Sequence, residues 1–503
     1  MTPGHLRRNT RTVLGLVASL VVLVPLATVW LSSLVPASYS VMAMGEAEYG
    51  GGAADQLHSA HDTWEWTGPT PGPADVSVVD LAGPADRTPD VSAELVVRRE
   101  TVRLASGESV EAVTVNGTTP GPQINVTQGD LVEVTLVNES VPDGATLHWH
   151  GVDVPNAEDG VAGVTQDAVG VGESHVYRFV ADDPGTYWYH SHQVSHEQVR
   201  AGLFGTLVVE PAAPAPVEHD VTAAVHTYGS TVTVNGSSGT SRRPAEPGET
   251  VRVRVVNTDS GVRRISVAGA PFQVVAVDGR DVNAPADVAD QAVLVPAGGR
   301  ADLGFRTPAD GSAVQVEFGG ATLVVGPADA RPVAAPAPEA VLDLLHYGSS
   351  AELPFDPESP DRVFEYRIGR RPGFVDGRPG MFWTVNGRMY PDVPMYVVSD
   401  GDVVRMTIEN SRSDNHPMHL HGHHAVVLSR NGVAATGSPW WIDSLEVDRG
   451  ETYEIAFLAD NPGVWMDHCH DLVHATEGLV AHVAYAGVYT PFLIGGDIGN
   501  EPE

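Results

Sequence analysis

This chain of 503 residues has a single cysteine and no lysine. The single cysteine, Cys469, excludes an internal disulfide and a lipid-modified cysteine near the N-terminus. Lysine is absent, so arginine supplies all 29 basic residues against 64 acidic ones, and the formal net charge is −35. Such a chain repels nucleic acid and anionic lipid. The acidity indicates either a well-solvated surface or a surface that attracts cationic substrates.

One long apolar run lies near the N-terminus, over residues 13–35. Arg7, Arg8 and Arg11 precede it, as basic residues precede an export segment, and the Arg7-Arg8 pair hints at twin-arginine export. The run is long enough to cross a bilayer as a membrane anchor, which we favour, although the small residues at 41–43 could also serve a signal peptidase. The sequence therefore predicts an exported protein, either on the extracytoplasmic face of the cell membrane or secreted.

The composition, with 53 Gly and 38 Pro, predicts many turns and short strands. A repeat occurs three times as Val-Asn-Gly, a turn, and an alternating strand that ends in Asn, over 115–138, 234–257 and 385–410. The copies begin about 120 and 150 residues apart, which suits a Greek-key β-sandwich each. We therefore expect an all-β fold of three consecutive sandwich domains.

Proline-rich stretches mark the domain boundaries, and the segment before the first copy has no periodicity. The predicted division is 1–40 signal peptide or anchor, 41–92 flexible linker, 93–213, 214–332 and 333–490 as three domains, and 491–503 as a C-terminal tail. His58 and His61 in the linker are expected to be bystanders.

Ten of the 21 histidines fall in four short clusters. They are His148, His150, His190, His192, His416, His419, His421, His468, His470 and His474. In a strand, residues i and i+2 point the same way, so four His-X-His pairs present eight imidazoles. Eight nitrogen donors exceed what one tetrahedral zinc uses and suit several copper ions. A multinuclear copper site is the prediction.

Cys469 stands between His468 and His470, so its sulfur points to the opposite side of that strand. There it can meet His416 and His474. Two imidazoles with one thiolate are the ligands of a blue-copper electron-transfer centre.

These motifs resemble those of the multicopper oxidases, a family that includes laccases and ferroxidases, and the likeness covers roughly residues 95–488. The resemblance implies cupredoxin-like domains and four copper ions, which are one type 1, one type 2 and two type 3. It implies the following ligands: His416, Cys469 and His474 for type 1, His148 and His419 for type 2, His150, His190 and His470 for one type 3 ion, and His192, His421 and His468 for the other.

Two further positions take roles from the resemblance. Leu479 stands where the family places its axial type 1 residue, and a side chain that does not coordinate usually raises the copper potential. Asp159 lies in the loop where the family keeps an acid near the type 2 copper, and it is the candidate that delivers protons to reduced oxygen. The alternative for Asp159 is an ordinary Asp-Gly turn, with Glu158 as its neighbour.

The family's second acid is missing, because its usual positions hold Leu472 and Ala475. Asp471 or Glu477 could substitute. The middle repeat carries none of the clustered histidines and is expected to be a spacer. His196, His423 and His424 fit no i, i+2 pair and are expected to support the fold without binding metal.

The reaction implied is the oxidation of a reducing substrate, one electron at a time, with O₂ reduced to water. The substrate is a phenol or an aromatic amine as in laccases, or alternatively a metal ion such as Fe(II), Mn(II) or Cu(I). The 9 methionines are too few for the methionine-rich insertion of a dedicated cuprous oxidase. A nitrite reductase would not need all four His-X-His pairs, whereas a copper-binding scaffold without activity is the third possibility.

Overall fold

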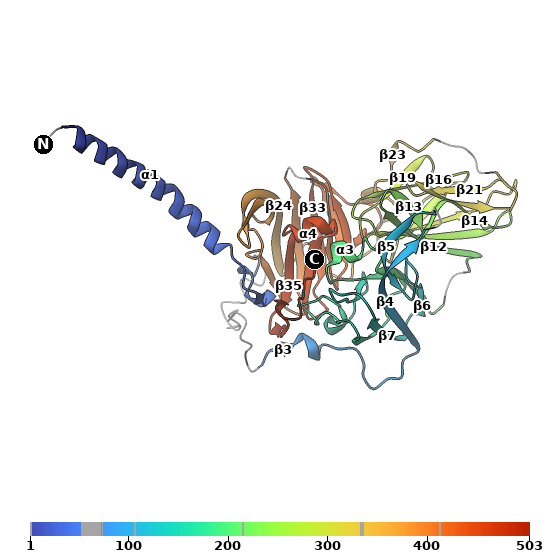
Figure 1. The fold of residues 1–503 in the computed structure, drawn as a ribbon. Helices are drawn as coiled ribbons and strands as arrows, with labels where there is room; N and C mark the ends of the chain where they lie inside the picture. The colour runs from blue at the N-terminus through green and yellow to red at the C-terminus, as the bar shows by residue number, and fades with distance from the viewer. Residues whose placement is uncertain are drawn as a thin grey trace.

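The protein is described by a computed structural model that covers residues 3–51, 72, 74–104, 107–213, 216–331, 336–411 and 414–503. Strands dominate it, and three β-sheet units follow one another along the chain (Figure 1). The predicted all-β class is confirmed. His58 and His61 lie outside the described residues.

The same strand arrangement recurs at the centre of each unit. A strand pairs in parallel with the repeat's closing strand, which in turn pairs antiparallel with a third strand. The trios are β4 (Val91–Arg103), β7 (Leu131–Asn138) and β9 (Ser174–Val180); β12 (His219–Tyr228), β15 (Thr250–Asn257) and β20 (Arg300–Arg306); and β24 (Arg362–Val375), β27 (Val403–Asn410) and β33 (Thr452–Leu458). The sequence repeat is therefore a structural repeat.

The asparagines that define the repeat form the same turn and the same kind of hydrogen bond in each copy. Asn116, Asn235 and Asn386 adopt φ values of 53°, 50° and 52° in the turns after β5 (Ser109–Val115), β13 (Thr231–Val234) and β25 (Arg378–Val385). Asn tolerates this left-handed conformation better than most residues. At the other end of the first copy, Asn138 donates from Nδ2 to the carbonyls of Val141 and Val169, at 2.9 and 2.8 Å. Asn257 and Asn410 bind loop carbonyls in the same way.

Nine of the ten clustered histidines lie in, or within two residues after, strands of the second sheets of the first and third units, and His474 lies in the short helix α4 (Leu472–Thr476). In the first unit the strand order of this sheet is β6 (Ile124–Thr127), β11 (Phe204–Glu210), β10 (Gly185–His190) and β8 (His148–His150). In the third unit the strand order is β26 (Met395–Val398), β35 (Val480–Tyr485), β34 (Val464–Cys469), β28 (His416–Leu420) and β32 (Ser444–Val447). His148 is paired with His190, and His419 with His468, so strand register brings the clusters together.

The second unit is a continuous series of strands. Besides those above it contains β14 (Ser237–Pro244), β16 (Arg263–Ala268), β17 (Phe272–Val277), β19 (Gln291–Val295), β21 (Val314–Glu317) and β22 (Ala321–Gly326). β23 (Ala340–Val341) pairs with β19, so its strand pairing continues past the predicted limit at residue 332. The predicted division into six segments stays a prediction.

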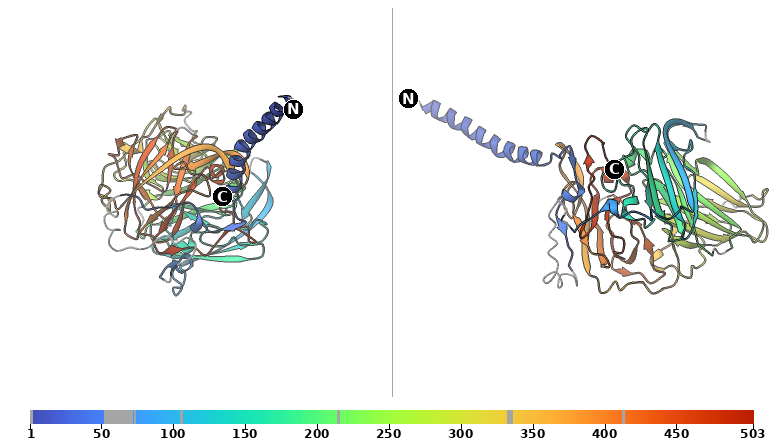
Figure 2. Two further views of the ribbon diagram at one scale, coloured as in Figure 1. Left: turned by 90° about the vertical axis from the view of Figure 1, so that its left-hand side faces the viewer. Right: turned by 90° about the horizontal axis from the view of Figure 1, so that it is seen from below.

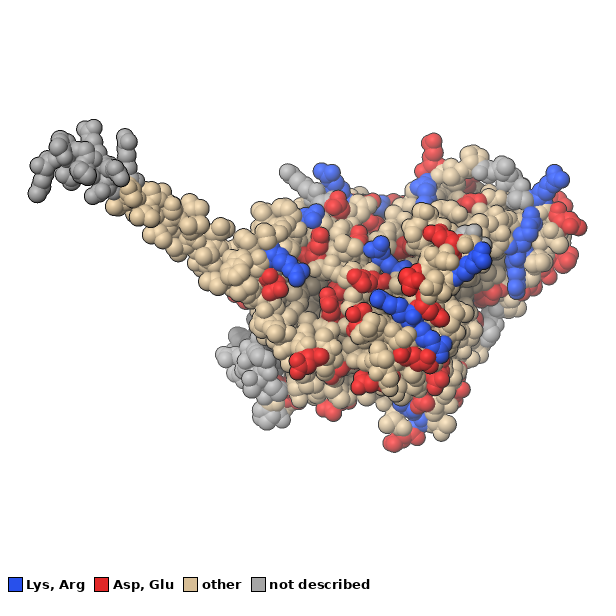
Figure 3. Space-filling model, in the orientation of Figure 1, with Lys and Arg blue, Asp and Glu red and all other residues tan. Residues whose placement is uncertain are grey.

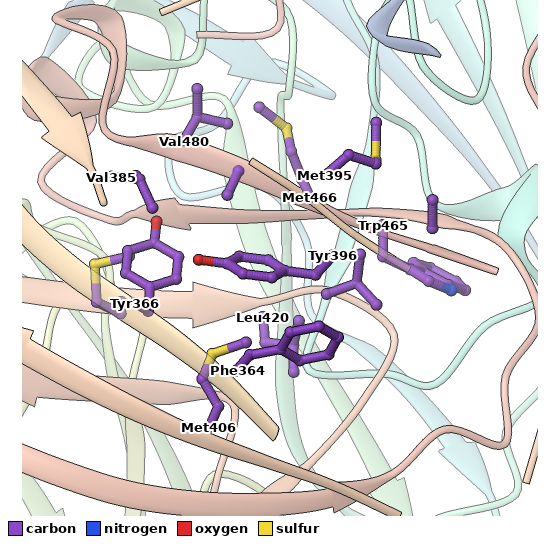
Figure 4. Close-up of a cluster of buried hydrophobic side chains, with 14 of the residues drawn as sticks. Phe364, Tyr366, Val385, Met395, Tyr396, Met406, Leu420, Trp465, Met466 and Val480 are labelled. Carbon is purple, nitrogen blue, oxygen red and sulfur yellow. The ribbon is translucent and has the colours of Figure 1, made fainter. Parts of the chain in front are cut away.

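An aromatic and aliphatic core fills the third unit behind the histidine-bearing strands. Figure 4 shows Tyr366 and Tyr396 facing each other, with ring centroids 6.0 Å apart, near Phe364 and Met406. Trp465 on β34 is fully buried in the same cluster. Because interiors are close-packed, this core fixes β34, the strand that carries Cys469.

The N-terminal helix α1 (Pro3–Ser32) projects from the body in all three ribbon views (Figures 1 and 2). Its stretch Thr12–Ser32 is long and apolar enough to cross a membrane, with a mean hydropathy of 2.4 and no part buried. Figure 3 shows this stretch bare of charged side chains, whereas acidic and basic groups are interspersed over the body. At its end, Trp30 Nε1 donates to the Gly377 carbonyl at 2.9 Å, and the Asp376 N–H donates to the Ser33 carbonyl at 2.8 Å. The helix is compatible with an export signal or an anchor.

The described parts of the expected linker and tail differ from that expectation, because they pack on the third unit. Val41, Met42 and Val78 are buried in its core, so short apolar stretches hold a segment that lacks any periodicity. The strand pairs are β1 (Ser38–Tyr39) with β37 (Ile494–Gly495), β2 (Ala47–Glu48) with β26, and β3 (Val76–Ser77) with β36 (Val488–Tyr489).

Candidate metal centre

Eight buried imidazoles meet between the first and third units. All are at most 1% exposed: His148, His150, His190, His192, His419, His421, His468 and His470. The shortest separations join Nε2 of His421 to Nε2 of His468 at 3.2 Å, and Nε2 of His148 to Nε2 of His419 at 3.3 Å. Two nitrogens that bind one ion at about 2.0–2.1 Å lie roughly 3–3.6 Å apart. The spacing therefore suits shared metal ions.

The imidazoles form overlapping groups whose ligand atoms all lie within 4.8 Å of one another. The groups are His148 with His150 and His190, His148 with His419 and His421, and His192 with His421 and His468. The last one coincides with a predicted type 3 set. The ring centroid of His470 lies 5.0 Å from that of His150 and 5.4 Å from that of His190, the two histidines predicted to share its ion. Neither of its ring nitrogens has a partner in another described residue, which leaves both open to a metal.

Asp159 holds two of these rings from outside the cluster. Its carbonyl and its Oδ1 lie 2.9 and 3.0 Å from Nδ1 of His148, and its Oδ2 lies 3.1 Å from Nδ1 of His421. Oxygen partners at Nδ1 turn the Nε2 atoms toward a metal. Glu158 is occupied elsewhere, since it accepts from the backbone N–H groups of Gly83 and Arg178. Of these two adjacent acids, Asp159 is thus the one that contacts the cluster.

Sequence reasoning missed Asp443 and Arg300. Asp443 Oδ1 lies 3.2 Å from Nε2 of His150, and the Asp443 carbonyl lies 2.8 Å from Nδ1 of His419. Arg300 on β20 donates to both carboxylate oxygens of Asp443, at 2.6 and 2.5 Å, with neither side chain exposed. No spacing relates these residues to the histidine motifs, so the sequence offers no hint of them.

The second unit was expected to be only a spacer, but it contributes Arg300, which binds Asp443 beside the cluster. Gly298, also in the second unit, lies against His150. Its φ is +78°, and a Cβ added to it would lie 2.7 Å from Cε1 of His150. A side chain there would be strained and would collide with the imidazole. The second unit thus closes one side of the cluster.

The expected tail also reaches the cluster. The Pro502 carbonyl lies 2.9 Å from Nδ1 of His192, and Glu503 Oε1 lies 3.0 Å from Nδ1 of His468. The two expected substitutes for the second acid lie elsewhere: Glu477 pairs with Arg370 at 3.1 Å, and Asp471 sits 3.6 Å from His474. In this fold the acid facing His468 is Glu503.

A separate group joins Cys469 with two histidines. The Cys469 sulfur lies 3.6 Å from Nδ1 of His416 and 3.8 Å from Nδ1 of His474, and the sulfur is buried. Leu479 is fully buried next to this group, where its N–H donates to the His474 carbonyl at 3.0 Å and its carbonyl accepts from the Cys469 N–H at 3.1 Å. Trp383 lies with its ring centroid 4.6 Å from those of both histidines.

Burial sets the protonation of these donors. It lowers the pKa of His416 to about 3 and keeps those of six cluster histidines well below the ordinary value. These six are His150, His190, His192, His419, His421 and His470. Burial also raises the pKa of the Cys469 thiol, so a thiolate there needs a cation as its partner. Neutral imidazoles and one sulfur are donors that fit copper.

His196, His423 and His424 belong to neither group of ligand atoms. His423 Nε2 lies 2.7 Å from the Tyr485 hydroxyl, and His424 Nε2 lies 3.1 Å from the Asp278 carbonyl. His196 is near Glu197, at 3.9 Å. Each of these three side chains contacts another group of the protein.

A copper-binding oxidase is the class that a sulfur-containing site and a histidine cluster on linked strands define. Two sequence models of multicopper oxidases match the chain, one over residues 96–214 and the other over residues 365–487. Laccase-1 of Botryotinia fuckeliana is 29% identical over 76% of this chain and 80% of its own length, and the iron transport multicopper oxidase fetC of Epichloe festucae is 28% identical over 73% and 72%.

The crystal structure of a multicopper oxidase from Pseudomonas thermotolerans superposes with a TM-score of 0.66 at 28% identity, over 79% of this chain and 99% of that one. The chain belongs to the multicopper oxidase family and is an oxidoreductase.

Proposed function

We propose that the chain binds four copper ions with the predicted ligands and couples the one-electron oxidation of phenols or aromatic amines to the reduction of O₂ to water. The observation that carries this is the position of Cys469, within 3.8 Å of two imidazoles, directly between His468 and His470 of the cluster. Copper, when bound, supplies the electron acceptance and the oxygen chemistry.

The chain's own residues bind, orient and connect. Cys469 is joined to His468 and His470 by the backbone alone, which gives a short covalent path between the two sites. Asp159 orients His148 and His421 and is the buried carboxylate closest to both. We infer that it is also the group that delivers protons to reduced oxygen. Leu479 is the proposed axial residue, which would favour a high potential and hence phenols.

A metallo-oxidase acting on Fe(II), Mn(II) or Cu(I) is the second candidate. Asp471 favours it, because its carboxylate lies 3.6 Å from Nε2 of His474, a side chain that is 14% exposed. A carboxylate at the exposed edge of a type 1 ligand could hold a cation. A scaffold without activity ranks third, since every predicted copper ligand is present.

Oxygen uptake with two kinds of reductant tests the proposal. The copper-loaded protein should show an intense cysteine-to-copper band in the visible spectrum and consume one O₂ per four molecules of a phenol such as syringate. Uptake with Fe(II) but not with the phenol would favour the second candidate. A colourless protein that takes up no O₂ would contradict both.

We also propose that the protein is exported and that α1 anchors it. The supporting observation is the exposed apolar stretch Thr12–Ser32. A version that starts at residue 37 should leave the membrane fraction and stay soluble. If the full chain is also soluble after export, then α1 is removed as a signal.

A further inference from the structure

A groove of about 630 Å³ lies beside the candidate type 1 site, along β24 and β25. Four arginines and one acid line it, together with Trp383. These charged residues are Arg367, Arg370, Arg371, Arg449 and Asp414. In a chain with 64 acidic and 29 basic residues, this local excess of positive charge runs against the composition.

Two of the four arginines are free to bind an anion. Arg367 and Arg370 have acidic neighbours, Glu365 at 3.9 Å and Glu477 at 3.1 Å. Within the described ranges, no carboxylate lies within ion-pair distance of Arg371 or Arg449, and both side chains are exposed. A guanidinium can bind a carboxylate through two parallel hydrogen bonds.

Trp383 lines the groove and also contacts the two histidines of the candidate type 1 site. The Arg370 guanidinium lies 4.7 Å from the ring centroid of Trp383, and the same ring lies 4.6 Å from those of His416 and His474. A planar molecule stacked on the free face of Arg370 would be separated from both histidines by the guanidinium and the Trp383 ring.

We propose that this groove binds the reducing substrate as an anionic aromatic molecule, a phenol that carries a carboxylate, with the carboxylate on Arg371 and Arg449. This assignment rests on the proposed oxidase function. Each phenol loses one electron to the type 1 site and its hydroxyl proton to water, so that four phenols and one O₂ give four phenoxyl radicals and two waters. The same four arginines repel Fe(II) and Mn(II) from this entrance.

Steady-state kinetics with syringate and its neutral methyl ester test the charge preference. We expect the KM of syringate to be about 5- to 10-fold lower than that of the ester at low salt, with a smaller gap in salt because exposed charges are screened. The double variant R371Q/R449Q should raise the KM of syringate about 10-fold and leave kcat and the ester unchanged. Arg243→Gln, at an exposed position on β14 in the second unit, is the matched control and should change neither KM.

Binding of a molecule that is not oxidised separates the groove from the oxidase activity. In calorimetry on the copper-loaded protein, benzoate should bind more tightly than benzamide, and R371Q/R449Q should abolish the difference. Equal binding of benzoate and benzamide, or a KM for syringate that does not respond to R371Q/R449Q, would overturn the inference about the groove. If the protein still oxidises the ester, the proposed oxidase function stands. Selective benzoate binding by a protein that oxidises neither phenol would support the groove and overturn the proposed function.

Discussion

Asp159 contacts two histidines that come from different units of the chain. One carboxylate therefore fixes the ring of His148 from the first unit and that of His421 from the third. Because it is only 1% exposed, water cannot replace it easily. Its position explains why an acid is needed in this loop and why the neighbouring Glu158 cannot serve.

Replacing Asp159 with Asn removes the negative charge but keeps the size of the side chain. We expect O₂ consumption to fall about 10- to 100-fold, the usual cost of losing an oxygen partner of metal-binding histidines. Oxygen-electrode assays with matched copper loading measure it. Glu158→Gln is the control, and it should lose thermal stability rather than turnover; equal activities of D159N and the unmodified protein would contradict the role of Asp159.

Leu479 is the residue whose substitution should change the electronics with little change in packing. Leu479→Met brings a thioether beside the type 1 site, and a coordinating axial residue lowers the copper potential. The exchange conserves volume, so the cost in stability should stay below about 1.5 kcal/mol. Redox titration of the visible band should give a lower potential in L479M, and an unchanged potential would mean that position 479 is not axial.

At the scale of elements, β34 shows what the sequence could predict. Period-two alternation placed His468 and His470 on one face and Cys469 on the other, and the structure brings the sulfur to His416 and His474. Local alternation and short spacings are readable in a sequence. Asp443, Arg300 and Glu503 were not predictable, because only the folded chain brings them to the histidines, at separations that follow no motif.

Strand β32, in the same sheet as β34, carries a half-buried acid. Burial, with the nearby Asp448, Asp471 and Glu451, raises the pKa of Glu446 from 4.5 to about 7. Between these two values the native protein keeps a proton that the unfolded chain has released, so stability falls as the pH rises through this window, by roughly 3 kcal/mol.

Glu446→Gln should remove this dependence. Thermal unfolding from pH 4 to pH 8 should show E446Q gaining stability relative to the unmodified protein as the pH rises. The exposed Glu358→Gln serves as the control and should follow the unmodified protein. A stability difference between E446Q and the unmodified protein that does not vary with pH would contradict the raised pKa.

At the scale of the whole molecule, the second unit joins the other two around the cluster. The Arg300–Asp443 pair crosses from the second unit to the third, and both side chains are buried. Buried ion pairs cost desolvation energy, and this one also places the carboxylate that meets His150. The second unit, which has no predicted copper ligand, therefore helps to position a carboxylate at the cluster.

Arg300→Gln leaves the Asp443 charge buried without its partner. Breaking such a pair typically costs about 3–5 kcal/mol, so we expect a large fall in unfolding free energy and weaker copper retention. Urea unfolding measures the first effect. The control is Arg306→Gln at the exposed end of the same strand β20, and equal stability of the two variants would show that the pair is not structural.

The architecture was predictable because it repeats. Val-Asn-Gly turns and closing asparagines recur at domain-sized intervals, and each marks the same point of a β unit. The linker and the tail escaped prediction, since Val41, Met42 and Val78 pack through a few isolated apolar contacts with no period.

The copper content of the reconstituted protein tests the central claim most directly. We predict four copper ions per chain, and three in Cys469→Ser, which should lose the visible band while the histidine cluster keeps its ions. A content of one ion or none, or a Cys469→Ser variant that keeps four ions and the visible band, would contradict the assignment of a type 1 site joined to a three-copper cluster.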